Sequence, residues 1–410
     1  MLPVTDRVPV IAGIGLSELP VAPHLTAAGH HALAARRAIE DCGISKGDID
    51  GYFAAGAYDE AVTTAEYLGI RPRFIGGAMT GGTSFELFVE QAMLAIEAGH
   101  AEVVLISYGS DLLSARGRSL GTGELGTAGG GAAGASTAGG GAAGTARAVG
   151  KLVGGPAAFE APFGNTLVGA YAMAAMRHFY EFGTTPEQIA EVAVAMRRHA
   201  ALNPVAMHRD PITVEDVTAS RMIADPLHLL DCCLVTDGGG AVVVTTSERA
   251  RDLRQLPVYL LGAASAMSHW NVSQMPDFTT TAAARCGPEA FARAGVSPDE
   301  IDVAQLYDSF TITVVLLLED LGFCKKGEGG SFVAGGRLGP GGSLPTNTDG
   351  GGLSAYHPGM RGIFLLVEAA RQLRGQAGRA QVPGCSLALA CGSGGWLSCM
   401  GAVIMGAEHP

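Results

Sequence analysis

Charged side chains are scarce in this sequence. Asp, Glu, Lys and Arg make up 16% of its 410 residues, against 48% for hydrophobic residues. A chain of this length and composition can bury a large core, in two to three average domains or one large double domain. It also leaves little charged surface. This balance favours a subunit interface, so we expect a homo-oligomer.

Basic clusters and long apolar runs are also missing. The chain has 39 acidic and 27 basic residues, for a formal net charge of −12. Because no row of Lys and Arg could neutralise successive phosphates, we expect no nucleic-acid partner. The longest strongly apolar stretch, residues 312–318, is too short to span a bilayer. The first 20 residues lack the basic region and cleavage site of a secretion signal. We therefore expect a cytoplasmic protein.

Paired cysteines are absent. None of the eight cysteines forms a CxxC pair, and none has the spacing of zinc ligands. Free thiols in a reducing compartment are the simplest interpretation, with no metal or redox cofactor. The cysteines are Cys42, Cys232, Cys233, Cys286, Cys324, Cys385, Cys391 and Cys399.

An internal repeat is the most informative feature that is present. Residues 38–50 align with residues 290–302 without a gap. Each copy has the pattern of a helix that ends at a glycine, Gly43 or Gly295, followed by a short turn into a strand. Such a pattern can recur by chance, but the identities favour duplication. The identical pairs are Ala38 and Ala290, Gly43 and Gly295, Ser45 and Ser297, Ile49 and Ile301, and Asp50 and Asp302.

A second parallel extends the repeat. In each half, a Gly-rich segment precedes a helix and then a strand that is almost continuously apolar, as expected for strands buried on both faces. The sequence therefore predicts an α/β fold built from two diverged copies of one unit. The first copy has its Gly-rich segment at 81–84, its helix at 86–98 and its strand at 102–108; the second has them at 350–354, 361–374 and 386–390.

Between the two halves, residues 112–240 are predicted to form a mostly helical insertion. Helices are expected over Leu167–Phe182 and over 186–201, the second after a cap at Thr184-Thr185. A Gly/Ala-rich stretch at 121–155 has no hydrophobic periodicity and is expected to be a mobile loop. It contains a formal GxGxxG, but the strand and helix that a nucleotide site needs are missing. The first half then takes residues 1–111 and 241–260, and the second takes residues 261–410.

Polar residues gather at three places in the second half. They are residues 305–310 after a predicted strand at 301–306, residues 347–359, and residues 391–395 after a strand that ends at Ala390. Strand ends and glycine loops place side chains and N–H groups in a crevice at the carboxyl edge of a sheet. Each has a plainer alternative: a packed ring with a helix cap at Tyr307-Asp308, and loop shaping at residues 356–358. Their coincidence with a duplicated unit favours a site.

This pattern resembles the thiolase superfamily over nearly the whole chain, and most of all its sterol-carrier-protein type. The segments that carry the resemblance are residues 11–15, 103–108, 236–238, 307–308, 351–359 and 392–395. The resemblance implies two βαβαβαββ halves packed as five αβαβα layers. It also implies a loop domain inserted between the halves and a tight homodimer.

Three departures separate this chain from a working thiolase. The nucleophilic cysteine of thiolases should stand at residues 79–85, but no cysteine lies between Cys42 and Cys232. Their His-Asp pair is replaced by Tyr307-Asp308, and their Gly-His-Pro by Tyr356-His357-Pro358. Claisen thiolysis needs a thiolate to hold the acyl group. Two tyrosines gained in its absence suit proton transfer without a covalent intermediate.

The combination resembles the thiolase-like aldolases that cleave steroid side chains in bacterial cholesterol degradation. The strings that carry this closer resemblance are residues 177–185, 306–311, 321–329 and 347–352. It implies retro-aldol cleavage of a β-hydroxyacyl-CoA to a ketone and a short acyl-CoA. In that reaction Tyr307 and Tyr356 would share the base and acid roles. His357 and the N–H groups of Gly392, Gly394 and Gly395 would hold the thioester oxygen, and Asp308 and Gly352 would complete the CoA-substrate site.

The resemblance also implies a partner, a small accessory protein with a zinc ribbon and an OB-fold, that would bind the homodimer in a heterotetramer. Two other functions stay open at this point. One is residual thiolase or acyltransferase activity through Cys391, which lies near the acid/base cysteine of thiolases, or through another cysteine. The other is a non-catalytic carrier of lipid or acyl-CoA.

Overall fold

A computed structural model describes residues 7–56, 58–116, 160, 163 and 166–409. The Gly/Ala-rich stretch predicted as a loop lies outside the described residues. The first half and the strand that returns to it after the insertion contain β1 (Pro9–Leu16), α1 (Ala27–Cys42), η1 (Lys46–Asp48), β2 (Gly51–Ala55), α2 (Tyr58–Leu68), β3 (Phe74–Ala78), η2 (Gly81–Thr83), α3 (Ser84–Glu97), β4 (Val103–Ser110), β7 (Gly238–Thr246) and α10 (Ser247–Ala250).

The second half begins at β8 (Val258–Met267) and runs to the C-terminus. Its first part contains η5 (Val272–Gln274), α11 (Ala283–Ala294), η6 (Pro298–Glu300), β9 (Val303–Leu306), α12 (Thr311–Asp320), α13 (Gly329–Val333) and η7 (Ala334–Gly336). Its last part contains the π-helical turn η8 (Gly351–Ala355), α14 (Gly362–Leu373), η9 (Gly378–Ala380), β10 (Leu387–Gly394) and β11 (Cys399–Gly406). The apolar run at 312–318 is thus part of α12, whose ten residues are all buried.

The described strands of both halves form one nine-stranded sheet in the order β3-β2-β4-β7-β1-β8-β11-β10-β9. The two halves meet at β1 and β8, which pair only through Val10 with Tyr259 and Ile11 with Val258. Strand β2 runs parallel to β3 and β4, and β9 runs parallel to β10. The other neighbours in the sheet are antiparallel.

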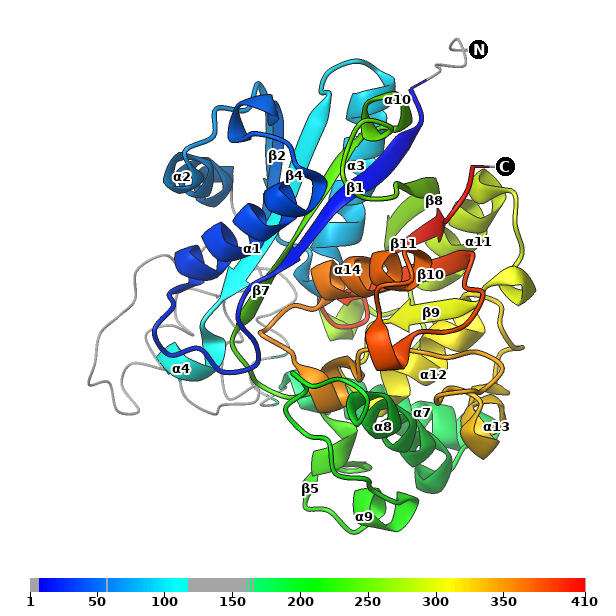
Figure 1. The fold of residues 1–410 in the computed structure, drawn as a ribbon. Helices are drawn as coiled ribbons and strands as arrows, with labels where there is room; N and C mark the ends of the chain where they lie inside the picture. The colour runs from blue at the N-terminus through cyan, green and yellow to red at the C-terminus, as the bar shows by residue number, and fades with distance from the viewer. Residues whose placement is uncertain (1–6, 57, 117–159, 161–162, 164–165, 410) are drawn as a thin grey trace.

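Helices form three layers around this sheet (Figure 1). Helix α1 covers the outer face of the first half, across β1, β4 and β7, and α11 covers the outer face of the second half, across β8 and β11. Helices α3 and α14 lie between, and each contacts strands of both halves. Helix α14 is buried nearly all round, which is why its sequence shows little polar surface. The predicted five-layer α/β arrangement is confirmed. The described second half supplies four strands to the sheet and the first half five, and a single parallel bridge between Ala304 and Thr346 stands where the predicted βαβαβαββ pattern has a further strand.

The sequence repeat corresponds to a repeated structure. Helices α1 and α11 both end at a left-handed glycine, Gly43 with φ 81° and Gly295 with φ 70°, and a short 3₁₀ turn follows each. The two repeated aspartates have the same role. Asp50 accepts hydrogen bonds from the N–H groups at the start of β4, and Asp302 accepts them at the start of β10. In each half the carboxylate thus joins one strand to its neighbour.

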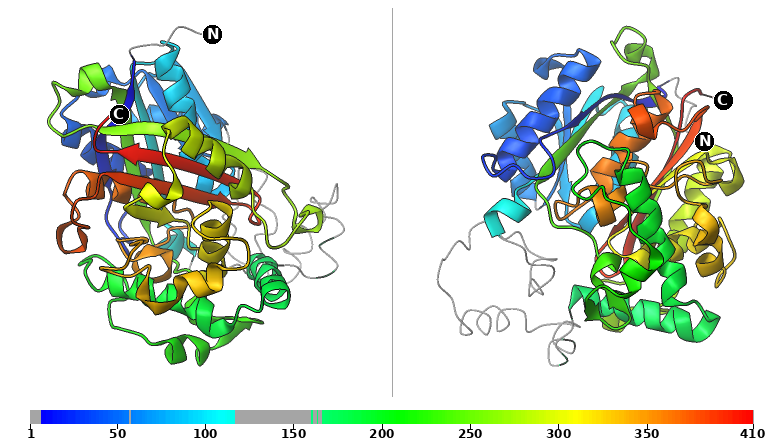
Figure 2. Two further views of the ribbon diagram at one scale, coloured as in Figure 1. Left: turned by 90° about the vertical axis from the view of Figure 1, so that its right-hand side faces the viewer. Right: turned by 60° about the horizontal axis from the view of Figure 1, so that its bottom comes forward.

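The described part of the insertion contains α4 (Leu112–Arg116), α7 (Leu167–Phe182), α8 (Pro186–Ala200), α9 (Val214–Thr218), β5 (Met222–Ala224), β6 (Leu227–His228) and η4 (Leu229–Asp231). Helix α7 has the predicted bounds, and α8 ends one residue earlier than predicted. Both views of Figure 2 place α7 and α8 beside the second half. The fully buried His178 on α7 joins Glu319 on α12 at 2.9 Å. No described helix is long and apolar enough to cross a membrane.

Candidate active site

Tyr307 follows β9 directly and lies at the centre of the site. Its N–H donates to the Cys391 carbonyl on β10 at 2.9 Å, which fixes the residue at the end of the sheet. Its hydroxyl lies 3.0 Å from Nε2 of His357, and the two rings meet edge to face with centroids 5.6 Å apart. Both side chains are more than nine-tenths buried. The structure therefore brings together two predicted site residues that are fifty positions apart.

Burial controls the protonation of this pair. It raises the pKa of the Tyr307 phenol well above its usual value, with the neighbouring Cys233, Tyr171 and Tyr108 adding to the effect. It also lowers the pKa of His357 to about 4, and the Arg361 charge lowers it further. At neutral pH the phenol is thus protonated and the imidazole is uncharged. When the imidazole carries its proton on Nδ1, the phenol donates to Nε2 and the ring is a neutral base in direct contact with the hydroxyl.

Tyr356 faces a different direction. Its backbone is extended, at φ −162° and ψ 144°, so its side chain and that of His357 lie on opposite sides of the chain. The Tyr356 ring packs against Phe364 with centroids 5.3 Å apart, and the Arg361 guanidinium lies 5.3 Å from its centre. Among the described residues no contact joins the rings of Tyr356 and Tyr307. The structure therefore separates the two predicted tyrosines, and the catalytic role of Tyr356 stays a prediction.

Asp308 holds the loop that carries His357. Its carboxylate accepts the N–H of Gly352 at 2.8 Å and that of Leu353 at 3.2 Å, both in the turn η8. Burial raises the pKa of Asp308 to about 6, although Arg361 at 3.3 Å opposes this. Arg361 is fully buried and also joins Asp349 at 2.5 Å. Asp308 and Gly352, which we predicted to bind substrate, thus serve first to fix the geometry of the loop.

The predicted glycines of the β10 loop are places of close approach. A Cβ on Gly392 would collide with the Glu86 carboxyl, and one on Gly394 would collide with the Thr80 carbonyl. Gly395 has φ +62°, which side chains rarely adopt. These residues let the end of β10 lie directly against the segment 79–84, where thiolases would carry their nucleophile. They shape the wall of the site, and their role toward a thioester oxygen stays a prediction.

The segment 79–84 contributes backbone and no thiol. A Cβ on Gly82 would collide with the ring and hydroxyl of Tyr307, so the phenol fills the space beside this glycine. Cys391 offers no replacement. Gly392 faces α3, and because strand residues alternate, Cys391 faces the outer layer, near Cys286 of α11. Burial raises the pKa of its thiol well above the usual value, so it is not a thiolate.

Gly82, Glu86, Arg361 and Tyr171 were not among the site residues predicted from the sequence. Tyr171, on α7 of the insertion, packs against Phe310 with ring centroids 4.4 Å apart, and its hydroxyl lies 3.5 Å from the Gly395 carbonyl. The sequence could not distinguish this tyrosine from a core residue, because a tyrosine on the buried face of an amphipathic helix is common. Glu86 and Arg361 had a usable signal, since each interrupts an apolar or Gly-rich segment that the fold must bury.

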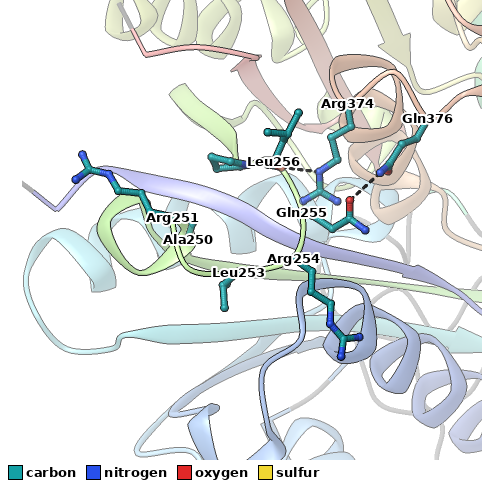
Figure 3. A pocket seen from close by; sticks show the side chains of 9 residues that line it. Ala250, Arg251, Leu253, Arg254, Gln255, Leu256, Arg374 and Gln376 are labelled. Atoms are coloured by element: carbon teal, nitrogen blue, oxygen red, sulfur yellow. Dashed lines mark hydrogen bonds between the residues drawn. The ribbon is translucent and has the colours of Figure 1, made fainter.

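A cavity of about 260 Å³ lies elsewhere, at the connection from β7 to β8. The connection begins at the C-terminal end of β7. Gly238, at the other end of this strand, lies next to Pro358 of the site, so the cavity and the site are at opposite ends of β7. Figure 3 shows Arg374 donating to the Leu256 carbonyl and Gln376 donating to Gln255. Arg374 also pairs with Asp41 at 3.0 Å, so it joins the two halves. The cavity contains none of the predicted site residues.

Comparisons with known proteins agree with this fold. Residues 264–407 match the family model described as Thiolase C-terminal domain-like. A steroid side-chain-cleaving aldolase from Thermomonospora curvata is 36% identical over 89% of this chain and 90% of its own length. The 17-hydroxy-3-oxo-4-pregnene-20-carboxyl-CoA lyase of Mycobacterium tuberculosis is 43% identical over 53% of this chain and 58% of its own. A solved Ltp2-ChsH2(DUF35) aldolase superposes with a TM-score of 0.82, at 32% identity and 98% coverage of each chain.

Fold, site and family model together define a member of the thiolase superfamily whose nucleophile loop has no thiol. Within that superfamily, the chain belongs to the family of the steroid side-chain-cleaving aldolases. The family resemblance drawn from the sequence is thereby confirmed.

Proposed function

We propose that this protein is an aldolase that cleaves the Cα–Cβ bond of a β-hydroxyacyl-CoA, giving a ketone and a short acyl-CoA. One observation carries the proposal: beside the thiol-free loop, a protonated phenol is hydrogen-bonded to a buried neutral imidazole. The names of the similar aldolase and lyase support a steroid side-chain thioester as substrate. The substrate itself is a CoA thioester, and the chemistry requires no further cofactor.

The reaction begins with the loss of the β-hydroxyl proton. That proton passes to the Tyr307 oxygen while the phenol proton moves to Nε2 of His357, so the tyrosine never carries a full charge. As the Cβ–O bond becomes a carbonyl, the Cα–Cβ bond breaks and its electron pair enters the thioester as an enolate. Protonation of the enolate carbon completes the short acyl-CoA. In this scheme Tyr307 acts with His357 as the base. Tyr356 is the candidate that the sequence offers for the acid that protonates the enolate.

The thiolase alternative makes an opposite prediction about covalent chemistry. Because no described cysteine faces Tyr307 as a thiolate, incubation with an acyl-CoA should leave the chain unmodified in intact-protein mass spectrometry. A stable acyl adduct on any cysteine would support the acyltransferase alternative. Release of a ketone from a β-hydroxyacyl-CoA identifies the aldolase, because a thiolase would transfer an acyl group through an acyl-enzyme and a carrier would bind the thioester and leave it intact. Cys391→Ser should retain cleavage, since under this proposal the thiol performs no step.

We also propose that the protein works as a homodimer with a small OB-fold and zinc-ribbon partner. The similar solved structure bears the name of an aldolase paired with a DUF35 component, which supports a partner of this kind. Strand β3 supports the dimer, because it is an edge of the described sheet and all five of its residues are partly exposed. A mass near twice 41.8 kDa in light scattering would support the dimer, and a monomer would refute it.

A further inference from the structure

Glu86 is a buried acid that the proposed mechanism leaves unused. It lies in the first turn of α3 and is 1% exposed. Neither of its carboxyl oxygens has a hydrogen-bond partner among the described residues. Acidic side chains are almost never buried in this way unless they are paired, because the loss of hydration is expensive. The position therefore calls for a functional explanation.

Three glycines from three different elements make room for this side chain. A Cβ on Gly362 at the start of α14, or on Gly392 in β10, would collide with the carboxyl group itself. A Cβ on Gly401 in β11 would lie 2.8 Å from the Glu86 Cβ, too close for a normal contact. A methyl group at any of these positions would displace the acid. The three glycines thus leave space for the carboxyl group, although no neighbouring group in the described part of the chain donates a hydrogen bond to it.

The carboxyl also lies where loops of the site converge. Thr83, at the end of the thiol-free segment, lies against Gly392, and the carbonyl of Gly82 lies against Gly362. Gly362 follows His357 by five residues, and Gly82 contacts the Tyr307 ring. Glu86, in the first turn of α3, is therefore only four residues along the chain from Gly82 in η2, the glycine that adjoins the phenol.

Burial raises the pKa of Glu86 to about 8. At neutral pH the group is a carboxylic acid with a proton to give. Tyr307 and His357 act on the β-hydroxyl, whereas the enolate carbon formed by bond cleavage needs an acid of its own. A neutral acid with a pKa near the working pH suits that step.

We propose that Glu86 is the acid that protonates the enolate carbon of the short acyl-CoA. This inference rests on the proposed aldolase function. The O–H bond of the carboxyl breaks, a C–H bond forms at Cα, and Glu86 is left as a carboxylate. The proton taken from the β-hydroxyl remains on His357. After product release, His357 loses that proton to water and Glu86 regains one from water, so the cycle closes without a further reactant.

Deuterium exchange tests this assignment apart from cleavage. In the reverse direction, the Glu86 carboxylate removes a Cα proton from the product thioester, so wild-type protein with its partner should incorporate deuterium into propionyl-CoA or acetyl-CoA in D₂O. Glu86→Gln should slow the incorporation at least about 100-fold. At neutral pH it replaces one uncharged group by another of the same size. Tyr307→Phe, which acts on the β-hydroxyl, should retain the exchange.

Glu90→Gln is the matched control, because Glu90 lies one turn further along α3 and pairs with Arg293 on the surface. It should exchange at the wild-type rate. Glu86→Leu removes the acid without a new polar group and replaces Glu86→Gln if circular dichroism shows that variant to be unfolded. If wild type cleaves substrate while the Glu86 variants exchange normally, or if Tyr356→Phe alone abolishes exchange, the assignment to Glu86 is wrong. If wild type neither cleaves nor exchanges, the aldolase function itself fails.

Discussion

At the scale of single residues, the Tyr307 hydroxyl has a structural and a chemical role that can be separated. Tyr307→Phe keeps the ring against Gly82 but loses the hydrogen bond to His357. We expect cleavage to fall roughly 10²–10⁴-fold, the usual contribution of a general acid–base group. The free energy of unfolding should fall by only about 1 kcal/mol, the net value of one buried hydrogen bond. Steady-state kinetics and urea unfolding measure the two effects.

Tyr52→Phe is a suitable control for this variant. Tyr52 is fully buried on β2, and its hydroxyl bonds Ser107 at 2.9 Å, outside the site. It should lose about the same stability and keep its activity. Equal activity in both phenylalanine variants would refute the role of Tyr307 in proton transfer.

Glu86 should also give the protein a particular dependence of stability on pH. Burial raises its folded-state pKa from 4.5 to about 8. Between these values the folded state holds a proton that the unfolded state has lost, so stability falls as pH rises, by about 1.4 kcal/mol per unit for one proton. Below 4.5 and above 8 the slope vanishes. Cys391 is the neighbouring titratable group, and burial keeps its thiol protonated over this range.

Glu86→Gln should therefore flatten the curve between about pH 5 and 8. Its stability relative to wild type should rise steadily across that window, measured by denaturant unfolding in buffers of matched ionic strength. Parallel curves for the two proteins would mean that Glu86 is ionised in the folded state at all these values.

The sequence was sufficient to predict Tyr307, Asp308 and His357 as site residues, because each follows a strand or stands in a glycine loop, and the structure places Tyr307 in contact with His357. It could not show that the phenol bonds to the imidazole, since this depends on how β9 and η8 approach each other. It also grouped Tyr356 with Tyr307, although an extended backbone turns neighbouring side chains to opposite sides. The direction of a side chain within a loop is a property of the folded backbone.

At the scale of elements, Arg361 joins two loops that the sequence presented separately. It bridges Asp308 after β9 to Asp349 before η8 and also donates to the Tyr356 carbonyl at 3.1 Å. Arg361→Met would leave two buried carboxylates without their cation. We expect a loss of about 3–5 kcal/mol in the free energy of unfolding, as for other broken buried ion pairs.

Arg36→Met is the surface counterpart of this variant. Arg36 is mostly exposed on α1 and lies 3.7 Å from Glu40, so its removal should change stability by less than about 0.5 kcal/mol. A similar small effect at Arg361 would show that the two carboxylates are protonated or hydrated in the folded protein.

The regular elements were more predictable than the turns between them. Helix α7 has the predicted bounds, and α14 and β9 differ from prediction by one or two residues. Residues 350–354 were expected only as a Gly-rich segment, yet Gly351–Ala355 form a π-helical turn. That turn depends on Asp308 and Asp349, which accept its N–H groups. Hydrophobic periodicity indicates which side chains are buried, but it does not indicate hydrogen bonds from the backbone to distant carboxylates.

At the scale of the whole molecule, the two halves should unfold together. Helices α3 and α14 contact strands of both halves, and β1 pairs with β8. Neither half can keep these surfaces buried alone, so a single transition is expected. Trp270 and Trp396 both lie in the second half, so tryptophan fluorescence reports on that half and far-ultraviolet circular dichroism on both. Coincident denaturation curves would support the expectation, and separated midpoints would contradict it.

The contact between Gly82 and Tyr307 limits how this protein could change its chemistry during evolution. A cysteine introduced at Gly82 would collide with the phenol, and a small residue at 307 alone would remove the proton relay without supplying a nucleophile. We therefore expect neither Gly82→Cys nor Tyr307→Ala alone to give an acyltransferase, because the first variant overlaps the phenol and the second supplies no thiol.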